Sequence, residues 1–414
     1  MKKRVVASWC LYDFAGASYA SVVTAVIFPV YYANHIVGNR AGLGDLWWGR
    51  AISLSMLIVA VTSPFAGGIA DRAGARKLFL AAYTLVTAVC VSMFSTLKAG
   101  AVLEGFWLMV AANVAKEGGF VFYNSFLPDI VPWRYWGRVS AWGYGIGYVG
   151  GGASLLFALS FVKAGHLPWV WFYVSAFFLV FSLPAFIWLP GRGYDGGEKG
   201  EKEGRRLARY AIEGTKSALR TMKSLWAGNP ASRRFLISYL FYQDGVNTVI
   251  IFSSIFATVS LGFKPTGLVG LYLVVQLTAL LGALAMAKPT DTWGPKKVIV
   301  LTLVLWMAVA LAAVFVREKG EFLAVAAVAG LGLGSIQAAS RALFSRFIPV
   351  GRESEYFGVY SMIGKTSAII GPFMFGLISH LTGSERPAVG SVAALFILGL
   401  VFIVPMKQPA APSQ

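Results

Sequence analysis

The sequence predicts an all-α membrane protein with twelve transmembrane helices in two bundles of six. Three observations support this: an apolar composition, twelve apolar stretches of membrane-spanning length, and a repeat that relates the two halves of the chain. Of the 414 residues, 57% are hydrophobic and only 13% are charged, whereas a soluble domain carries about 25% charged residues. Because a water-soluble fold could not bury this much apolar surface, the composition excludes the soluble classes.

A helix needs roughly 20 mostly apolar residues to cross a bilayer. Twelve stretches meet this length when the chain is divided at its charge clusters and Gly/Pro turns. The first is too long for a cleavable signal peptide and holds an internal charge. The predicted spans are 5–34, 47–70, 78–97, 105–127, 139–162, 167–190, 235–261, 266–287, 298–316, 322–340, 356–380 and 387–406.

The distribution of Lys and Arg predicts the orientation. With both termini in the cytoplasm, 26 of the 36 Lys and Arg fall on the cytoplasmic side and 8 on the outer side. Cytoplasmic loops of membrane proteins carry this excess of positive charge. The formal net charge of +18 therefore reflects topology, and we expect no nucleic-acid partner.

The segment 191–234 is the one long polar stretch. We expect an N-terminal six-helix bundle over 1–190, a cytoplasmic basic linker over 191–234, a C-terminal six-helix bundle over 235–406 and a tail over 407–414. Apolar residues recur in the linker every three or four positions, with Arg and Lys between them, which is typical of an amphipathic helix that rests on anionic headgroups. A tether with a helical segment and no function of its own explains the same pattern. The apolar positions are Leu207, Ala211, Thr215, Leu219, Met222 and Trp226.

The two halves repeat. DRAGARK, which begins at Asp71, matches DTWGPKK, which begins at Asp291, at an offset of 220. YWGRVSAWGYGIGYVGG, from Tyr135, matches YFGVYSMIGKTSAIIGP, from Tyr356, at an offset of 221. Because each half holds an even number of spans, the copies share one orientation and form a parallel repeat.

GGIADRAGARK, Gly67 to Lys77, resembles the loop signature of the major facilitator superfamily. Four further segments resemble the vacuole-effluxer family, which includes the fungal autophagy-related vacuolar amino-acid exporter. They are WCLYDFAGASYASVV in span 1, YNSFLPDIVP after span 4, YQDGVNTVIIF in span 7, and QAASRALFSRFIPVGRESEYFGVYSMIGK across spans 10 and 11. The resemblance implies solute export or uptake, with neutral amino acids as the best-known cargo of the family. We expect a secondary transporter that works by alternating access, a monomer and a multi-pass protein of a prokaryotic plasma membrane.

Two other cargo classes stay open on the same fold. Similarity to cation-coupled glycoside symporters keeps sugar transport as an alternative, and a lipid or amphiphile flippase would need a cavity that opens sideways to lipid. We expect no enzymatic activity, since no HExxH, paired Asp motif or GxSxG supports an intramembrane hydrolase. Cys10 and Cys90 lack metal-ligand spacing, and we expect neither a metal nor a cofactor.

Five charged residues fall near the middle of the predicted spans. A charge at mid-bilayer costs a few kcal/mol on insertion scales, so each is a functional-site hypothesis. The five are Asp13, Lys116, Glu117, Asp244 and Lys365. Opposite charges suit a small polar or zwitterionic substrate, and a membrane carboxylate suits proton coupling, with sodium as an alternative. A purely structural ion pair is the alternative for any one of them.

Polar and aromatic residues on the same helices extend the predicted substrate site. They are Tyr12, Asn113, Tyr123, Asn124, Gln243, Asn247 and Gln337.

The loop signature predicts a cytoplasmic latch. By resemblance, Asp71 lies near the positive N-terminus of the eleventh helix. Thr292 in the second copy replaces Arg72, so we expect the second latch to be weaker. The latch residues are Asp71, Arg72, Gly74, Arg76 and Lys77 in the first copy, and Asp291, Gly294, Lys296 and Lys297 in the second.

Overall fold

The computed structural model describes residues 2–38, 42–191, 203–259, 261–367, 370–382 and 385–409, and all regular structure in these ranges is helical. Ten helices within them are long and apolar enough to cross a membrane. Each of the ten coincides with a predicted span. They are Lys3–Val37, Leu43–Arg72, Arg76–Thr96, Trp133–Lys163, Leu167–Trp188, Pro230–Thr258, Gly267–Thr292, Pro295–Phe315, Lys319–Ser345 and Arg386–Ile403.

The other two predicted spans are helical but do not meet the same criteria. The span 105–127 corresponds to α5, Val102–Ser125, which includes three charged residues, Glu104, Lys116 and Glu117. The span 356–380 corresponds to two shorter helices, α14 (Glu353–Thr366) and α15 (Ile370–Thr382), and residues 368 and 369 between them lie outside the described ranges. The all-helical membrane architecture is thus confirmed, and the count of twelve spans stays a prediction.

Large apolar side chains lie exposed along the flanks of these helices. Leu57 is 60% exposed, Leu85 57%, Trp107 58% and Ile187 66%. Contiguous apolar surface of this kind is rare on soluble monomers. It matches the hydrocarbon of a bilayer, which confirms a multi-pass integral membrane protein.

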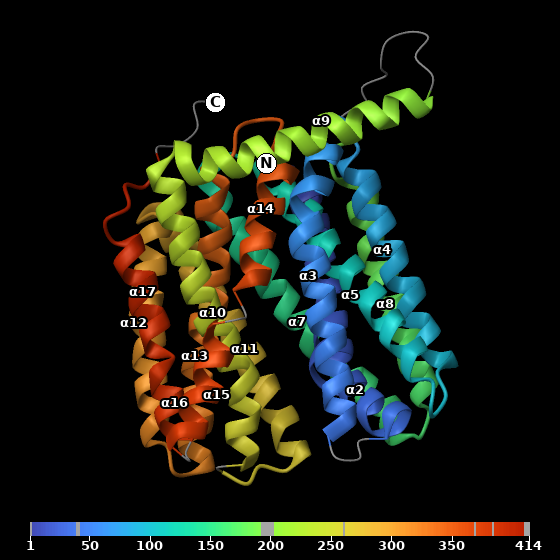
Figure 1. The fold of residues 1–414 in the computed structure, drawn as a ribbon, viewed down its shortest axis with the longest axis vertical. Helices are drawn as coiled ribbons and strands as arrows, with labels where there is room; N and C mark the ends of the chain where they lie inside the picture. Colours follow the sequence, from blue (N-terminus) through green and yellow to red (C-terminus); the bar gives the residue numbers. More distant parts are fainter. Residues whose placement is uncertain are drawn as a thin grey trace. The chain divides into compact units, whose positions relative to one another are not determined.

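The helices form two compact units (Figure 1). The first unit comprises Met1–Val131, Ile146–Thr221 and Pro349–Met362. In it α1 packs along α8, and α5 packs against both α3 and α4. Its elements are α1 (Lys3–Ser18), a π-helical turn region (Tyr19–Val26), α2 (Ile27–Tyr31), a second π-helical region (Tyr32–Val37), α3 (Leu43–Arg72), α4 (Arg76–Met93), α5, α6 (Leu127–Ile130), most of α7 (Trp136–Lys163), α8 (Leu167–Trp188), most of α9 (Glu203–Lys223) and most of α14.

The second unit comprises Pro132–Gly145, Met222–Ile348 and Ile363–Gln414. In it α11 packs along α13, α12 packs against α13, and α10 packs against α17. Its elements are the first turns of α7, the π-helical Ser224–Gly228, α10 (Pro230–Val259), α11 (Pro265–Thr292), α12 (Pro295–Phe315), α13 (Lys319–Ser345), the end of α14, α15, α16 (Glu385–Ser391) and α17 (Ala393–Ile403). The division 1–190 and 235–406 inferred from the repeat remains a prediction about the two bundles.

Glycines allow helices to touch backbone to backbone in each unit. In the first unit, a Cβ atom on Gly67 would overlap the carbonyl oxygen of Ser354, and one on Gly358 would overlap that of Ser63. In the second, a Cβ atom on Gly137 would lie 2.7 Å from Oδ1 of Asp291. Glycine at these positions therefore brings α14 against α3 and the start of α7 against the end of α11.

The predicted end of the tenth span is too early, because the helix continues past Arg341. The predicted tenth span ends at residue 340, which assigns Arg341 to a cytoplasmic loop. The structure extends α13 to Ser345 and buries Arg341 completely. A hydropathy boundary drawn at the first charge fails here because the guanidinium has protein partners.

Candidate substrate site and charged clusters

Two helix faces carry four of the seven predicted substrate-site residues of the first unit: Tyr12, Asp13, Lys116 and Tyr123. Trp9, Tyr12, Asp13 and Gly16 recur on α1 at helical spacing, and Lys116, Phe120 and Tyr123 do so on α5. Residues three, four and seven positions apart share one face of a helix. Contacts between the two faces bring a carboxylate and an ammonium group into one region.

Tyr123 is the centre of these contacts. Its ring stacks on Trp9, with centroids 4.6 Å apart, and on Tyr12, with centroids 5.1 Å apart. Its carbonyl oxygen accepts a hydrogen bond from Nε1 of Trp9 at 2.9 Å, and its hydroxyl donates to Oδ2 of Asp13 at 3.1 Å. The hydroxyl of Tyr12 lies 2.8 Å from Oγ1 of Thr84 on α4. The stack therefore fixes the half-buried Asp13 carboxylate against α5.

Lys116 reaches from α5 to the same side of α1. Its side chain is buried, and Nζ lies 5.2 Å from the centre of the Phe120 ring. A Cβ atom on Gly16 would lie 3.2 Å from Nζ of Lys116, so glycine leaves room for the ammonium group. Gly16 is three residues from Asp13, about 4.5 Å along the helix axis. The first unit thus holds opposite charges about one helical turn apart along α1.

The remaining predicted residues of the first unit have different surroundings. Asn113 is fully buried, donates to Oγ of Ser55 at 2.6 Å and accepts from the hydroxyl of Tyr19 at 3.5 Å. These bonds cross-link α5, α3 and the first span, which is a structural role. Asn124 is buried, and Glu117 is half-buried on a different side of α5 from Tyr123.

Asp244 in the second unit is 1% exposed and lies at the start of α15. Its Oδ2 accepts the backbone N–H of Gly371 at 2.9 Å, while its Oδ1 has no hydrogen-bond partner among the described residues. A carboxylate is favoured at a helix N-terminus because free N–H groups and the helix dipole point at it. Asp244 therefore caps the start of α15.

A short chain of amides continues from Asp244 along α10. Nε2 of Gln243 donates to Oδ1 of Asn247 at 3.1 Å, and Nδ2 of Asn247 donates to Oγ of Ser367 at 3.3 Å. Gln337 and Lys365 are each half-buried in the same unit. The structure thus links three of the five predicted second-unit residues, directly or through one another, to Ser367 and Gly371.

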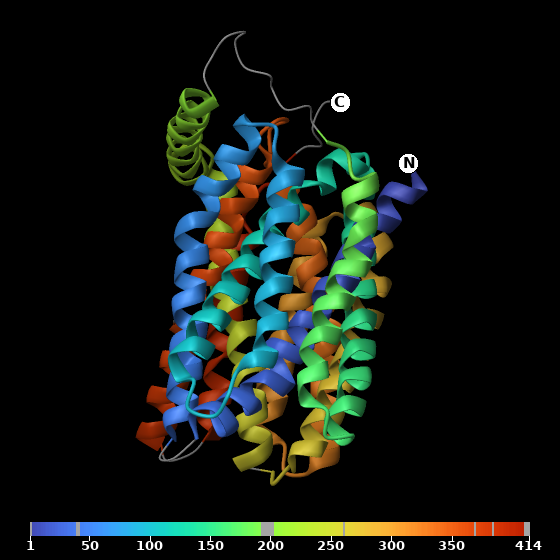
Figure 2. The same ribbon diagram turned by 90° about the vertical axis from the view of Figure 1, so that its right-hand side faces the viewer.

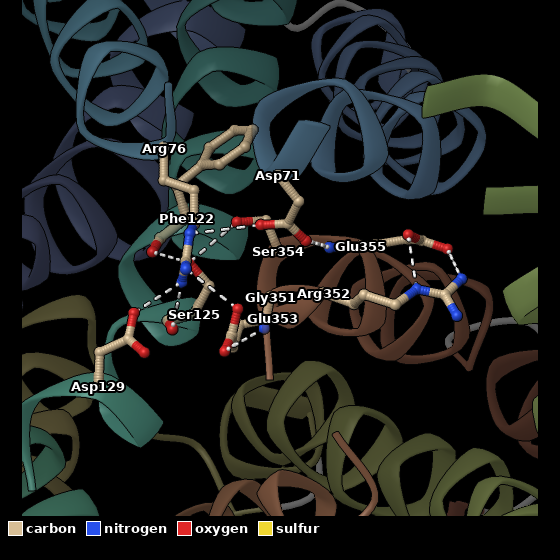
Figure 3. Close-up of polar contacts among 10 residues, drawn as sticks. All are labelled: Asp71, Arg76, Phe122, Ser125, Asp129, Gly351, Arg352, Glu353, Ser354 and Glu355. Carbon is tan, nitrogen blue, oxygen red and sulfur yellow. Dashed lines mark hydrogen bonds and ion pairs between the residues drawn. The ribbon is translucent and has the colours of Figure 1, made fainter. Parts of the chain in front are cut away.

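The first loop signature builds a buried ionic cluster around Arg76 (Figure 3). The Arg76 guanidinium pairs with Asp71 at 3.3 Å, with Asp129 at 3.0 Å and with Glu353 at 3.0 Å. It also donates to the carbonyl oxygen of Ser125 at 3.2 Å. Both Arg76 and Glu353 are buried. Three carboxylates around one guanidinium leave excess negative charge, which the N-terminus of α14 stabilises because Glu353 lies in its first turn.

Asp71 also contacts α14 directly. Its Oδ2 accepts the backbone N–H of Glu355 at 2.8 Å. The structure therefore places Asp71 at the N-terminus of the first part of the eleventh helix. Gly74 has φ 63°, the left-handed conformation that lets the chain turn from α3 into α4, and Lys77 donates to the carbonyl oxygen of Leu189 at 3.1 Å.

A second ion pair lies at the start of α14 and is hydrogen-bonded to α9. Arg352 pairs with Glu355 three residues later at 2.7 Å. The same guanidinium donates to the hydroxyl oxygens of Ser217 and Thr221, and Oγ of Ser217 donates to Oε2 of Glu355 at 2.9 Å. The start of α14 is consequently held on one side by Asp71 and on another by two hydroxyl groups of α9.

The second loop copy keeps the aspartate and loses the ionic cluster. Oδ1 of Asp291 accepts the backbone N–H of Arg138 near the start of α7 at 3.2 Å, and Oδ2 lies 3.4 Å from Nε of Arg138. Lys296, which matches Arg76, donates to the carbonyl oxygens of Val404 and Met406 at 2.7 Å each. Gly294 has φ 94°, as a left-handed turn requires, and Lys297 is exposed.

We predicted a weaker second latch because Thr292 replaces Arg72, but the two loop copies differ at another position. Arg72, whose replacement by Thr292 motivated the prediction, is exposed, as is Thr292 itself. The copies differ instead at Arg76, which forms three ion pairs, and at Lys296, which binds carbonyl oxygens. Arg can serve several carboxylates at once through its planar fork, and Lys cannot.

Sequence reasoning missed several residues of these clusters: Asp129, Arg138, Arg341, Arg352, Glu353 and Glu355. A signal existed, since only five of the 18 Asp and Glu fall in the short predicted cytoplasmic loops outside the linker 191–234: Asp71, Asp129, Asp291, Glu353 and Glu355. The sequence analysis placed Arg341 in a cytoplasmic loop and did not identify it as a buried charge. Its Nε donates to Oγ of Ser140 at 2.8 Å, and its guanidinium lies 4.1 Å from the centre of the Tyr144 ring.

Comparison with known proteins gives a family. Residues 50–413 match the model of the family described as vacuole effluxer Atg22 like. The chain is 28% identical over 414 residues to an uncharacterized transporter of the major facilitator type, YxiO, from Bacillus subtilis, with 96% of this chain and 93% of that protein covered. It is 24% identical over 472 residues to autophagy-related protein 22 of Coccidioides immitis, with 95% and 77% covered.

Solved structures share the fold. The human organic anion transporter MFSD10 superposes with a TM-score of 0.75 at 15% identity, covering 97% of this chain and 99% of that one. FucP, a major facilitator transporter solved in the outward conformation, superposes with a TM-score of 0.70 at 14% identity, covering 97% and 98%. These relatives are named as transporters and not as enzymes. The chain is therefore a major facilitator transporter that belongs to the Atg22-like vacuole-effluxer family.

Proposed function

We propose that this protein is a secondary active transporter of a small zwitterionic, amino-acid-like solute, that it works by alternating access of two six-helix bundles, and that it resides in a prokaryotic plasma membrane. The observation that supports this best is the pair of opposite charges on the facing sides of α1 and α5. The bacterial relative from Bacillus subtilis supports the location. The solute class is supported by the resemblance to the vacuole-effluxer family, whose best-known cargo is neutral amino acids.

The pair suits a molecule with two charged ends. The Asp13 carboxylate offers a partner for an ammonium group, and the Lys116 ammonium offers one for a carboxylate, about one turn away along α1. A substrate that carries both complementary charges would pair with both groups at once, whereas a neutral sugar would supply hydrogen bonds alone.

We further propose that transport is coupled to protons through Asp244, with Asp13 and Glu117 as other candidates. Asp244 is buried, and one of its oxygens accepts the N–H of Gly371 while the other has no hydrogen-bond partner in the described part of the chain. Protonation would remove the charge that the start of α15 stabilises. Binding and release of one proton would thus weaken and restore the hydrogen bond between Asp244 on α10 and the start of α15. Sodium remains an alternative, because carboxylate and amide oxygens also suit a hard cation.

The test is reconstitution of the full chain into liposomes with a panel of labelled amino acids, sugars and lysolipids. We expect uptake of an amino acid, and we expect Asp13→Asn and Lys116→Gln to weaken its binding at least tenfold, or ~1.4 kcal/mol. Lys98→Gln is a matched control outside the predicted spans. Uptake of a sugar or a lysolipid, with no uptake of an amino acid, would overturn the proposed cargo.

Coupling is tested separately with a pH dye in sodium-free proteoliposomes. Substrate should drive proton movement in the wild type and not in Asp244→Asn. Full-rate transport without proton flux, and without a response to an imposed pH gradient, would show a uniporter or a transporter coupled to another ion.

A further inference from the structure

Helix α9 lies beside the end of α3 in the first unit rather than beyond it (Figure 2). A Cβ atom on Gly68 of α3 would overlap the carbonyl oxygen of Gly214 on α9, so the two backbones are in direct contact. Gly68 is four residues, about 6 Å, before the end of α3 at Arg72. The middle of α9 is therefore level with the last turn of a membrane-spanning helix, which is the depth of the lipid headgroups.

One face of α9 is fixed against the unit. Tyr210, Ser217, Ala218 and Thr221 are all buried, with Gly214 among them. Tyr210 packs with Ala73, Ala75 and Phe79 at the turn between α3 and α4. The hydroxyl groups of Ser217 and Thr221 accept hydrogen bonds from Arg352. These contacts leave α9 no freedom to rotate about its axis, so the directions of its other two faces are defined.

The second face is apolar and exposed. Ile212 is 56% exposed and Leu219 is 53% exposed, with exposed Ala211 and half-buried Thr215 on the same side. At about 100° per residue, Leu219 lies about 140° round the helix from Gly214. This exposed stripe holds most of the first-unit part of the apolar pattern noted in the linker sequence.

The third face is basic and follows the apolar one. Arg209, Lys216 and Arg220 lie about 200° to 240° round from Gly214. Figure 2 looks along α9 from its N-terminal end with α3 on its right. Round the helix from Gly214, the face fixed on the unit is therefore followed by the apolar face and then by the basic face.

We propose that the exposed apolar and basic faces of α9 form a docking surface for anionic lipid headgroups. Apolar side chains beside Lys and Arg, at headgroup depth, are the features of an interfacial helix. The predicted orientation puts α9 at the cytoplasmic leaflet, whose anionic lipids attract juxtamembrane basic residues. The positive charge of the face argues for this occupant over a second copy of the chain, which carries the same charge.

The experiment places an environment-sensitive fluorophore on the full chain in nanodiscs. Leu219→Cys carries the label in a Cys10→Ala, Cys90→Ala background, because both native cysteines are buried. Nanodiscs of phosphatidylcholine alone are compared with nanodiscs that contain phosphatidylglycerol, each with and without a headgroup-level spin-labelled quencher lipid. Glu213→Cys, an exposed position on the basic side of the helix, is the matched control.

We expect strong quenching of the Leu219→Cys label in the anionic nanodiscs, at least twofold weaker quenching in phosphatidylcholine alone, and little quenching at Glu213→Cys. Replacement of Arg209, Lys216 and Arg220 by Gln should abolish the difference between the lipids. A label that stays in water in both nanodiscs, equal quenching in both lipids, or shielding that grows with protein concentration in detergent would each overturn the proposal. Since no readout requires transport, these outcomes are independent of the proposed cargo.

Discussion

Asp71 and Asp291 occupy matched places in the repeat but have different neighbours. Asp71 accepts the N–H of Glu355 and belongs to the buried Arg76 cluster, whereas Asp291 pairs with a partly exposed Arg138. Exposed ion pairs contribute little, and disruption of buried ones is costly. We expect Asp71→Asn to lower the transport rate at least about tenfold and Asp291→Asn less than about threefold.

The measurement is the initial rate of uptake in proteoliposomes with matched amounts of each variant, using the solute that the panel identifies. Equal rates for both variants and the wild type would remove the latch assignment from the first loop.

Arg76 forms ion pairs with Asp71, Asp129 and Glu353. Removing it takes the guanidinium away from the buried carboxylates of Asp71 and Glu353, so we expect Arg76→Ala to destabilise the protein by about 3–5 kcal/mol. Arg72→Ala, four residues away and exposed, should change stability by no more than about 0.5 kcal/mol. Thermal unfolding of the purified variants in one detergent checks both values. Equal midpoints for the two variants would contradict a stabilising role of the cluster.

At the scale of helices, the contact between α3 and α9 depends on two glycines. A methyl group on Gly68 would overlap the carbonyl oxygen of Gly214, so Gly68→Ala should push α9 away from α3. The reporter is a cysteine at Ala218, a fully buried position of α9, in the background without native cysteines. We expect its labelling by a water-soluble maleimide to rise at least about tenfold, as for a local opening that becomes ~1.4 kcal/mol easier.

Gly49→Ala on the same α3 helix is the matched control, because a Cβ atom there meets nothing within 4 Å. If labelling at Ala218→Cys stays slow in Gly68→Ala, the backbone contact between the two helices is not what holds α9.

Helix existence was largely predictable, and the partners of the helix ends were not. Length and hydropathy predicted the ten apolar helices because a bilayer fixes both quantities. The Gly371-Pro372 dipeptide favours a helix boundary within residues 356–380, but Asp244, which accepts the N–H of Gly371, is over 100 residues earlier in the chain and could not be assigned to it. The carboxylate partners of Arg76 could not be predicted because they also lie far from it in the sequence. Asp129 and Glu353 fall in short predicted loops, which suggests exposure to solvent, but the fold brings each to 3.0 Å from the Arg76 guanidinium.

At the scale of the whole molecule, the orientation in the membrane is a prediction from the distribution of Lys and Arg, and it is open to a direct test. We expect alkaline phosphatase fused after Lys163 to be active outside the cell and inactive when fused after Gly191. A fluorescent protein fused at the same two places should give the opposite result. The excess of 26 over 8 Lys and Arg is the physical reason. Phosphatase activity at Gly191 would reverse the topology and place α9 on the outer leaflet.

Dissolved ions should distinguish the two electrostatic features of the first unit. The Arg76 side chain is 5% exposed, and Glu353 is 2% exposed, so mobile counterions cannot reach between them. The charges on α9 face water, where the Debye length shrinks from about 10 Å at 0.1 M to about 3 Å at 1 M salt. Between these concentrations of NaCl the unfolding midpoint should lose no contribution from the Arg76 cluster, while quenching of the Leu219→Cys label in anionic nanodiscs should fall towards the value in phosphatidylcholine. Salt would thus weaken the binding of α9 to anionic lipids and leave the ion pairs of the Arg76 cluster intact.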